Sequence, residues 1–220
     1  MFKRLSVLFL IVAVAVNGQE SALTRGGDEV ILNPDGTWEY VTKADKDSTA
    51  DFAFRNVKWG SAQKLAKAEE KSELIPEVSD DQILGYSGSV GGLKSLIAYV
   101  FVDDQLWKGT YIFSEKHSNR NKYLEDYSKI KNILIDKYGE PSDENVHWSN
   151  DLYAEDQSQY GFAVSMGHLS FYSTWEIGET VISVTLTGDN YKIDHKVEYY
   201  NEHLRKIAAQ QQKKQSSSDF

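Results

Sequence analysis

The sequence predicts an α+β fold, a two-layer sandwich in which an antiparallel sheet carries helices on one face. Strand-length segments alternate between apolar and polar residues, as in Ile182–Leu186, which is the pattern of a sheet with one covered face. Two amphipathic helical segments are present to cover it. A helix followed by antiparallel strands occurs twice, which suggests two similar passes through the domain.

Length and composition restrict the protein further. A chain of 220 residues corresponds to one domain with a small appendage and buries roughly 70% of its unfolded surface on folding, so no metal or disulfide is needed for a core. The absence of cysteine excludes disulfide frameworks, cysteine nucleophiles, thiolate zinc sites and a lipid-bearing N-terminal cysteine. The net charge of −9 argues against nucleic acid as a partner.

Residues 1–18 have the features of a secretory signal peptide. Lys3 and Arg4 precede the apolar run Leu5–Val16, and cleavage is expected after Gly18. As a helix the run covers about 18 Å, well short of a hydrocarbon core roughly 30 Å thick. No second apolar stretch has spanning length. We therefore expect a soluble protein exported to the periplasm or the exterior of a bacterium, without integral membrane insertion after signal cleavage.

Residues 19–51 are predicted to form a β-hairpin followed by a polar linker. Val30–Leu32 and Trp38–Val41 flank Asn33-Pro34-Asp35-Gly36, in which Pro presets the turn and Gly supplies a positive φ. The string Val30-x-Leu32-Asn33-x-Asp35-Gly36-Thr37-Trp38-x-Tyr40 resembles a hairpin near the mature N-terminus of uncharacterised exported bacterial proteins. This resemblance implies no chemistry.

The α+β domain is predicted to cover residues 52–205. Its first pass begins with a helix capped by Ser61. The elements expected after the cap are a helix at Ala62–Ser72, a strand at Gln82–Ser87, a Gly-rich bend at Gly88–Gly92, and a hairpin of Ser95–Val102 and Gln105–Ser114 around Asp103-Asp104.

The second pass opens with the clearest helix, Asn119–Tyr138, which Gly139 and Pro141 should end. Its apolar stripe consists of Tyr123, Tyr127, Ile130, Leu134 and Tyr138. The elements expected after the helix are an acidic loop at Ser142–Gln157, a hairpin turning at Gly178-Glu179, a strand at Lys196–Tyr200 and a short helix at Glu202–Ala209. A disordered polar tail is predicted for residues 206–220.

Two phrases at the helix ends resemble a known family. They are Phe54-x-x-Val57-x-Trp59-Gly60-Ser61 and Lys137-Tyr138-Gly139-x-Pro141, which are similar to phrases in the SmpA/OmlA-like outer-membrane assembly lipoproteins. That family consists of periplasmic helix-and-sheet modules. Its lipid-bearing cysteine is missing here and its helices and strands follow a different order, so no function is transferred.

The Gly-rich segment matches no known type of catalytic loop. Gly85 to Gly92 contains neither a G-x-S-x-G elbow nor a phosphate loop with its lysine. We interpret it as a flexible connection at Gly85, Gly88, Gly91 and Gly92, and we predict no catalytic residue.

No metal site or cofactor is predicted. The run Asp45-x-Asp47-x-Thr49-x-Asp51 begins like a calcium loop, but the required Gly and bidentate Glu are absent. His195 and His203 are four residues apart on either side of a strand-to-helix change, which separates their directions.

Aromatic residues are the remaining indication of function. The chain holds 5 Trp, 13 Tyr and 9 Phe. On an open sheet face, Tyr99, Trp107, Tyr111 and Tyr172 would form a platform for a peptide, glycan or partner protein. The alternative is that they fill the core between the sheet and the helices.

The sequence therefore favours a non-enzymatic exported protein that binds a partner protein, peptide or envelope component through its sheet face or the cleft beside the Gly-rich segment. One alternative is a hydrolase acting on an envelope polymer, with residues near Gly85–Gly92 and His168 in its cleft. Another is a structural envelope-assembly protein whose hairpin and tail mediate assembly.

Overall fold

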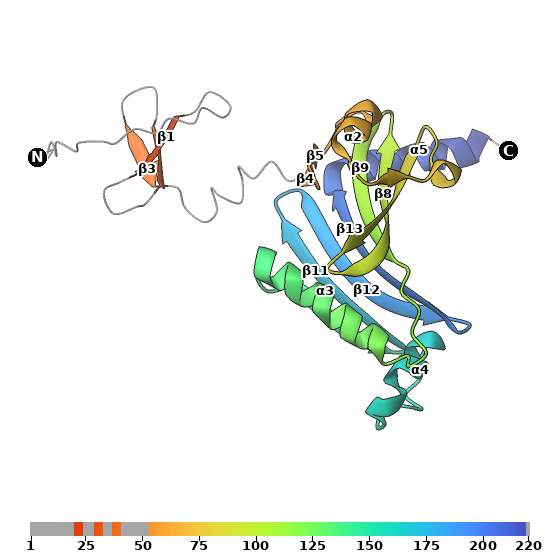
Figure 1. Cartoon of the computed structure of the whole chain (residues 1–220). Coiled ribbons are helices and arrows are strands. Elements are labelled where there is room, and N and C mark those ends of the chain that lie inside the picture. The colour runs from red at the N-terminus through yellow and green to blue at the C-terminus, as the bar shows by residue number, and fades with distance from the viewer. Residues whose placement is uncertain (1–19, 24–28, 33–36, 41–52, 219–220) are drawn as a thin grey trace, which may run out of the picture. The chain divides into compact units, whose positions relative to one another are not determined.

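The computed structural model describes residues 20–23, 29–32, 37–40 and 53–218 (Figure 1). The chain divides into two units, residues 1–51 and 52–220. The predicted signal peptide, the turn at 33–36 and the linker at 42–51 lie outside the described residues. No helix among the described residues is long and apolar enough to cross a membrane.

The first unit contains a small antiparallel sheet with the order β1-β2-β3. Its strands are β1 (Glu20–Leu23), β2 (Glu29–Leu32) and β3 (Trp38–Tyr40). Val30 pairs with Tyr40 and Leu32 with Trp38, which confirms the predicted hairpin. The additional strand β1 pairs with β2 and was not predicted.

The second unit is built on an eight-stranded antiparallel sheet with the order β10-β11-β12-β13-β9-β8-β7-β6. Its strands are β6 (Glu73–Leu74), β7 (Ile83–Val90), β8 (Leu93–Val102), β9 (Gln105–Phe113), β10 (Asp143–Trp148), β11 (Leu169–Ile177), β12 (Thr180–Asp189) and β13 (Lys192–Asn201). Strands β6–β9 and β10–β13 are two consecutive meanders. Their last strands, β9 and β13, pair at the centre, where Thr110 lies opposite Glu198.

Four helices and a short hairpin accompany this sheet, which confirms the α+β class with an antiparallel sheet. They are α2 (Gln63–Glu69), α3 (Lys122–Tyr138), α4 (Tyr160–Ser165), α5 (Glu202–Ser218) and the hairpin of β4 (Ala53–Phe54) with β5 (Val57–Lys58). Two 3₁₀ turns, η1 (Pro76–Val78) and η2 (Gln157–Gln159), complete the described elements.

Alternate residues along the strands form a buried surface, which we call the covered face. The register brings Tyr99, Gly109 and Tyr199 into one row across β8, β9 and β13. Helix α3 packs against β12 (Figure 1) and buries the middle of its predicted stripe, at Tyr127 and Ile130. The residues of the covered face are Leu84, Tyr86, Ile97, Tyr99, Gly109, Tyr111, Phe171, Ser173, Trp175, Ile182, Val184, Leu186, Val197 and Tyr199.

The hairpin β4–β5 covers this face where the two meanders meet. The Phe54 ring lies 5.0 Å from the ring of Tyr99 and 5.5 Å from that of Tyr199. A Cβ on Gly109 would overlap the Phe54 ring, so a glycine is required where the hairpin approaches the sheet.

The prediction of an acidic loop at residues 142–157 is wrong in part, because strand β10 occupies Asp143–Trp148. An edge strand tolerates charged and exposed residues. The charged residues Asp143 and Glu144 therefore do not give the sequence pattern expected of a strand. The short helix α4 was not predicted. Its six residues are too few to display a helical period.

Helix α5 also differs from the prediction, because it continues to Ser218 through most of the predicted disordered tail at 206–220. Ala, Gln and Lys dominate its middle and have high helix propensity. The side chain of Gln211 donates a hydrogen bond to Asp103 in the β8–β9 turn, which ties the helix to the sheet.

Candidate functional site

The four aromatic residues predicted to form a platform do not come together. Tyr99 is fully buried and Tyr111 half-buried on the covered face, where both rings contact Phe54. The core alternative is therefore correct for Tyr99. Tyr172 lies on the opposite face and is 39% exposed. Trp107 is half-buried at an irregularity in β9.

The Gly-rich segment is mostly a strand. Gly85 and Gly88 belong to β7, so the predicted connection is limited to the β7–β8 turn at Gly91 and Gly92, which have φ values of 57° and 76°. A Cβ at Gly85 would overlap Val78 of η1. Close packing therefore explains this glycine, and a loop is not required.

The residues nominated for a hydrolase are separated by the fold. Gly85 and its neighbours lie in β7, whereas His168 directly precedes β11, and four strands lie between β7 and β11 in the sheet. The His168 ring stacks near Tyr153. A histidine–carboxylate pair is present elsewhere, between His117 and Asp126 at 2.6 Å, but neither residue lines either cavity described below.

An ion pair at the end of α2 joins the buried carboxylate of Glu70 to the partly exposed Arg55 in the β4–β5 turn. The Arg55 guanidinium contacts both Glu70 carboxylate oxygens, at 2.6 and 3.1 Å. Tyr99 donates its hydroxyl hydrogen to Glu70 at 2.6 Å, and the backbone N–H of Ser72 donates at 2.8 Å. Burial alone would raise the pKa of Glu70, but these hydrogen bonds and the Arg55 charge outweigh it and lower the pKa. The carboxylate is saturated by its own chain, which indicates a structural role.

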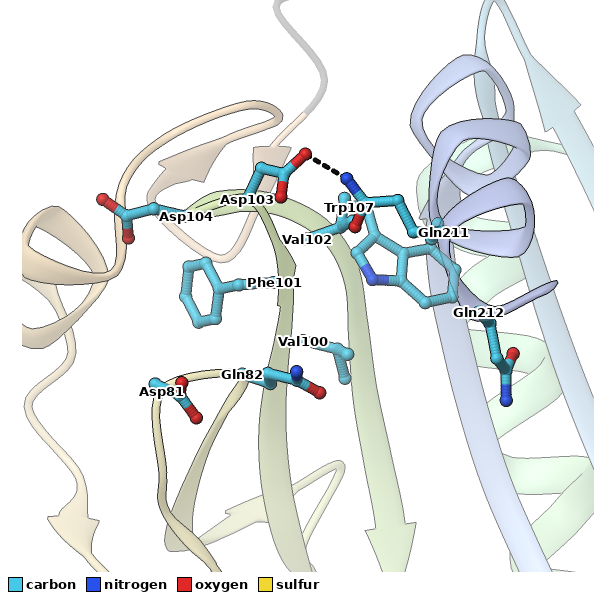
Figure 2. Close-up of a pocket in the computed structure, with 11 residues that line it drawn as sticks. Asp81, Gln82, Val100, Phe101, Val102, Asp103, Asp104, Trp107, Gln211 and Gln212 are labelled. Atoms are coloured by element: carbon cyan, nitrogen blue, oxygen red, sulfur yellow. Dashed lines mark hydrogen bonds between the residues drawn. The ribbon is translucent and has the colours of Figure 1, made fainter. Parts of the chain in front are cut away.

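A cleft of about 490 Å³ lies between α5, the β8–β9 turn and the segment before β7 (Figure 2). Ligand sites typically have volumes of about 300–1,000 Å³. Val100 and Val102 of β8 line it on one side, and Trp107 faces α5 (Figure 2). The complete lining is Asp81, Gln82, Val100, Phe101, Val102, Asp103, Asp104, Trp107, Ala208, Gln211 and Gln212.

A β-bulge places Trp107 in this cleft. Leu106 pairs with Phe101 and Lys108 pairs with Val100, so Trp107 is an extra residue without a partner on β8. Bulges of this kind redirect one side chain and are common beside functional sites. The indole N–H of Trp107 has no hydrogen-bond acceptor among the described residues. It is therefore free to donate to a ligand.

The polar groups of the cleft are mainly amides. The side-chain amide of Gln82 has no hydrogen-bond partner among the described residues and faces α5 across the cleft (Figure 2). Gln211 and Asp103 bond to each other at the upper rim. Asp104 points away from Trp107, and its carboxylate accepts the backbone N–H of Gln63 at the start of α2, at 2.8 Å. Among the residues that the structure describes, no Lys, Arg or His lines the cleft.

The cleft adjoins the exposed side of the sheet. Val100 of the cleft pairs with Lys108, and Lys108 pairs with Tyr200. We call this surface the open face; it consists of Lys108, Thr110, Ile112, Tyr172, Thr174, Glu176, Ser183, Thr185, Lys196, Glu198 and Tyr200.

The centre of the open face is polar and its edges carry larger side chains. The Glu198 carboxylate forms an ion pair with Lys108 at 2.5 Å and a longer one with Lys196 at 3.8 Å. Ile112 and Tyr172 are 37% and 39% exposed. A charged network flanked by exposed apolar and aromatic groups offers both contact area and specificity to a partner.

Sequence reasoning identified Trp107 and Tyr172 but missed the cleft. Gln82 and the α5 glutamines are 129 or more positions apart in the chain, and only the tertiary fold joins them. The bulge is visible in the burial pattern of β9, where buried Leu106 is followed by buried Gly109, a spacing of three that breaks the alternation of a strand.

Comparison of the chain with protein-family models, curated proteins and solved structures finds no match. Among the described residues, no group of three or more His, Asp or Glu side chains could hold a metal ion.

Proposed function

We propose that this chain is an exported, non-enzymatic binding protein whose open face and adjoining cleft receive a partner protein, peptide or envelope component. The observation that carries the proposal is the contrast between the two faces of one sheet. We further propose a two-layer arrangement in which α2, α3 and α4 are devoted to the covered face. The opposite surface is then left for recognition.

The packing contacts support this division. Phe54 of the hairpin, Tyr127 of α3 and Val164 of α4 all lie against the covered face. The open face keeps Ile112 and Tyr172 accessible at the two ends of a row that runs through Lys196 and Thr185. Exposed aromatic and aliphatic groups around a polar centre are the anchors expected of an interaction surface.

Photo-crosslinking in the native envelope tests the proposal. p-Benzoylphenylalanine is placed at Ile112 or Tyr172 on the open face and, as a matched control, at Ile133 of α3, which is 40% exposed beside the β7–β8 turn. Benzophenone inserts into C–H bonds of proteins and polysaccharides alike. We expect adducts from positions 112 and 172 and none from 133. Absence of adducts at 112 and 172, or equal yields at all three positions, would contradict the proposal.

Export is proposed from the sequence of residues 1–18 and has a separate test. The protein produced in a bacterial host should begin at Gln19 when its N-terminus is sequenced, and it should be recovered from the periplasm or medium. Recovery of the uncleaved chain from the cytoplasm would refute export and leave the binding surface untouched.

The hydrolase alternative has less support, because the cleft contains no histidine and His168 lies far from Gly85 in the strand order. The envelope-assembly alternative places the interaction in the N-terminal unit. Size-exclusion chromatography of a chain lacking residues 20–51 separates it from our proposal, since assembly through that unit requires a change of oligomeric state.

A further inference from the structure

We infer that the cleft beside α5 binds a neutral sugar residue of a glycan. The inference rests on the proposed binding function and names the ligand class of the cleft. The carrying observation is a cavity of about 490 Å³ in which a bulged tryptophan and an aliphatic lining meet amide and carboxylate groups, with no cation among the described lining residues.

The apolar part of the cleft suits the C–H face of a pyranose ring. Trp107 supplies a flat aromatic surface, and Val100 and Val102 supply an aliphatic one. Aromatic rings make favourable contacts with partners that present weakly positive hydrogens to their faces, and a sugar ring carries several axial C–H groups on one side.

The polar part suits hydroxyl groups, which donate and accept at neighbouring positions. With respect to the described part of the chain, the Gln82 amide has free donors and a free acceptor, and the Trp107 indole N–H is a free donor. Asp81 makes no hydrogen bond or ion pair with the described residues and supplies acceptors at the rim. Groups of both kinds, facing one cavity, match the alternating hydroxyls of a sugar.

The lining holds no Lys, Arg or His among the described residues, and the nearby Lys108 ammonium, 6.0 Å from the Trp107 ring centroid, is already paired with Glu198. An anionic ligand would therefore find no unpaired cation in the lining. A basic peptide is the competing occupant. It would rely on carboxylates, yet Asp104 already caps α2 and Asp103 is engaged by Gln211. The free groups that remain are mainly neutral, which favours the sugar.

The test is an NMR titration of the full mature chain that follows the indole N–H resonance of Trp107, assigned with Trp107→Phe. The probes are chitotriose, maltotriose and cellotriose, with trigalacturonate, trilysine and trialanine as competitors of other chemistry. At least one neutral trisaccharide should shift the resonance with a dissociation constant on the order of 1 mM. If no neutral trisaccharide shifts it at tenfold that concentration, or if trigalacturonate, trilysine or trialanine binds more tightly, the inference is overturned.

Variants locate the site. Trp107→Ala should weaken the neutral trisaccharide about tenfold, and Gln82→Ala about threefold. Gln82 is exposed and its amide has no partner in the fold, so its variant keeps the native structure if Trp107→Ala does not. The matched control is Asp194→Ala at the equivalent position of the β12–β13 hairpin, which should leave the affinity unchanged. Equal affinity for the Gln82→Ala chain and the parent chain would place the sugar elsewhere.

Failure of this inference is distinguishable from failure of the proposed function. If trisaccharides leave Trp107 unmoved while Ile112 and Tyr172 still give photo-adducts, the open face binds a partner and the sugar assignment is wrong. If trisaccharides bind in the cleft while Ile112 and Tyr172 give no adducts, the cleft binds its ligand without the open face, and the proposed function of the open face is wrong.

Discussion

The β8–β9 and β12–β13 hairpins have the same plan and different ends. Each turns through two residues with positive φ, Asp103-Asp104 (49° and 58°) and Asn190-Tyr191 (48° and 65°), as a type I′ turn requires. Three residues after the turn stands Trp107 in the first hairpin and Asp194 in the second. Trp107 is the bulge residue, whereas the second ladder runs without a shift through Asp194, which pairs with Thr187.

A cavity lies at the end of each hairpin, but the two cavities differ in volume and in the residues that line them. The hollow at the second hairpin has a volume of about 360 Å³ and is lined only by residues of its own two strands, Thr187–Asp189 and Lys192–Asp194. The first hollow gains walls from α5 and from Gln82, and the bulge supplies its aromatic surface. The extra residue in β9 and the helix that follows β13 therefore give this hairpin end the larger cleft, which we propose as the ligand site.

We call the meander β6–β9 the first half of the sheet and the meander β10–β13 the second half. The largest expected effect concerns the Arg55–Glu70 ion pair, which is hydrogen-bonded to Tyr99 of the first half. Glu70→Ala removes a carboxylate whose side chain is 1% exposed and leaves Arg55 and Tyr99 without their partner. We expect a loss of about 3–5 kcal/mol in unfolding free energy at pH 7, measured by urea denaturation. Because the folded pKa of Glu70 is lowered, this stabilisation is present above the unfolded pKa of about 4.3 and is lost as the pH falls through the folded value.

The matched change in the second half is Glu144→Ala. Glu144 pairs with Lys131 at 2.7 Å, but its side chain is 44% exposed. An exposed pair contributes about 0–1 kcal/mol. Losses of similar size for Glu70→Ala and Glu144→Ala would show that the first half is not anchored by charge.

The second half should instead depend on pH through His195, a buried residue of β13 that packs 4.4 Å from the Phe113 ring. Burial lowers the pKa of His195 to about 4, and the Asp126 charge offsets this only in part. The unfolded chain takes up a proton below about 6.5 while the folded chain does not. Stability should therefore fall by about 3 kcal/mol between pH 6.5 and 4.

Replacing His195 with Phe should remove this pH slope in urea denaturation series. His203→Phe, at an exposed position of α5, should retain it. A slope that survives His195→Phe would assign the acid sensitivity to other groups.

A smaller effect is expected where α3 meets the second half. The hydroxyls of Tyr127 and Ser173 bond at 2.8 Å in the interior. Tyr127→Phe should cost about 1 kcal/mol in unfolding free energy, and the combined Tyr127→Phe/Ser173→Ala chain should lose less than the sum of the single changes. Strict additivity in this double-mutant cycle would mean that the two hydroxyls do not interact.

The halves also differ in how far the sequence predicted them. The long hairpins and the α3 stripe were predicted because alternation and helical period are local signals that survive without context. Strand β10 and helix α4 were missed, since an exposed edge strand and a six-residue helix carry weak periods. The cleft required the bulge at Trp107 and the docking of α5, and the second is a tertiary contact that no local pattern encodes.

The most direct test of the account places p-benzoylphenylalanine at position 107 of one chain and at position 194 of another, and compares their adducts in the native envelope. The two positions are equivalent in the two hairpins, and only the first faces the cleft with α5. We predict adducts from position 107 and none from 194. Adducts from 194 in equal or greater yield, or none from 107, would contradict the claim that the first hairpin is the binding end of the sheet.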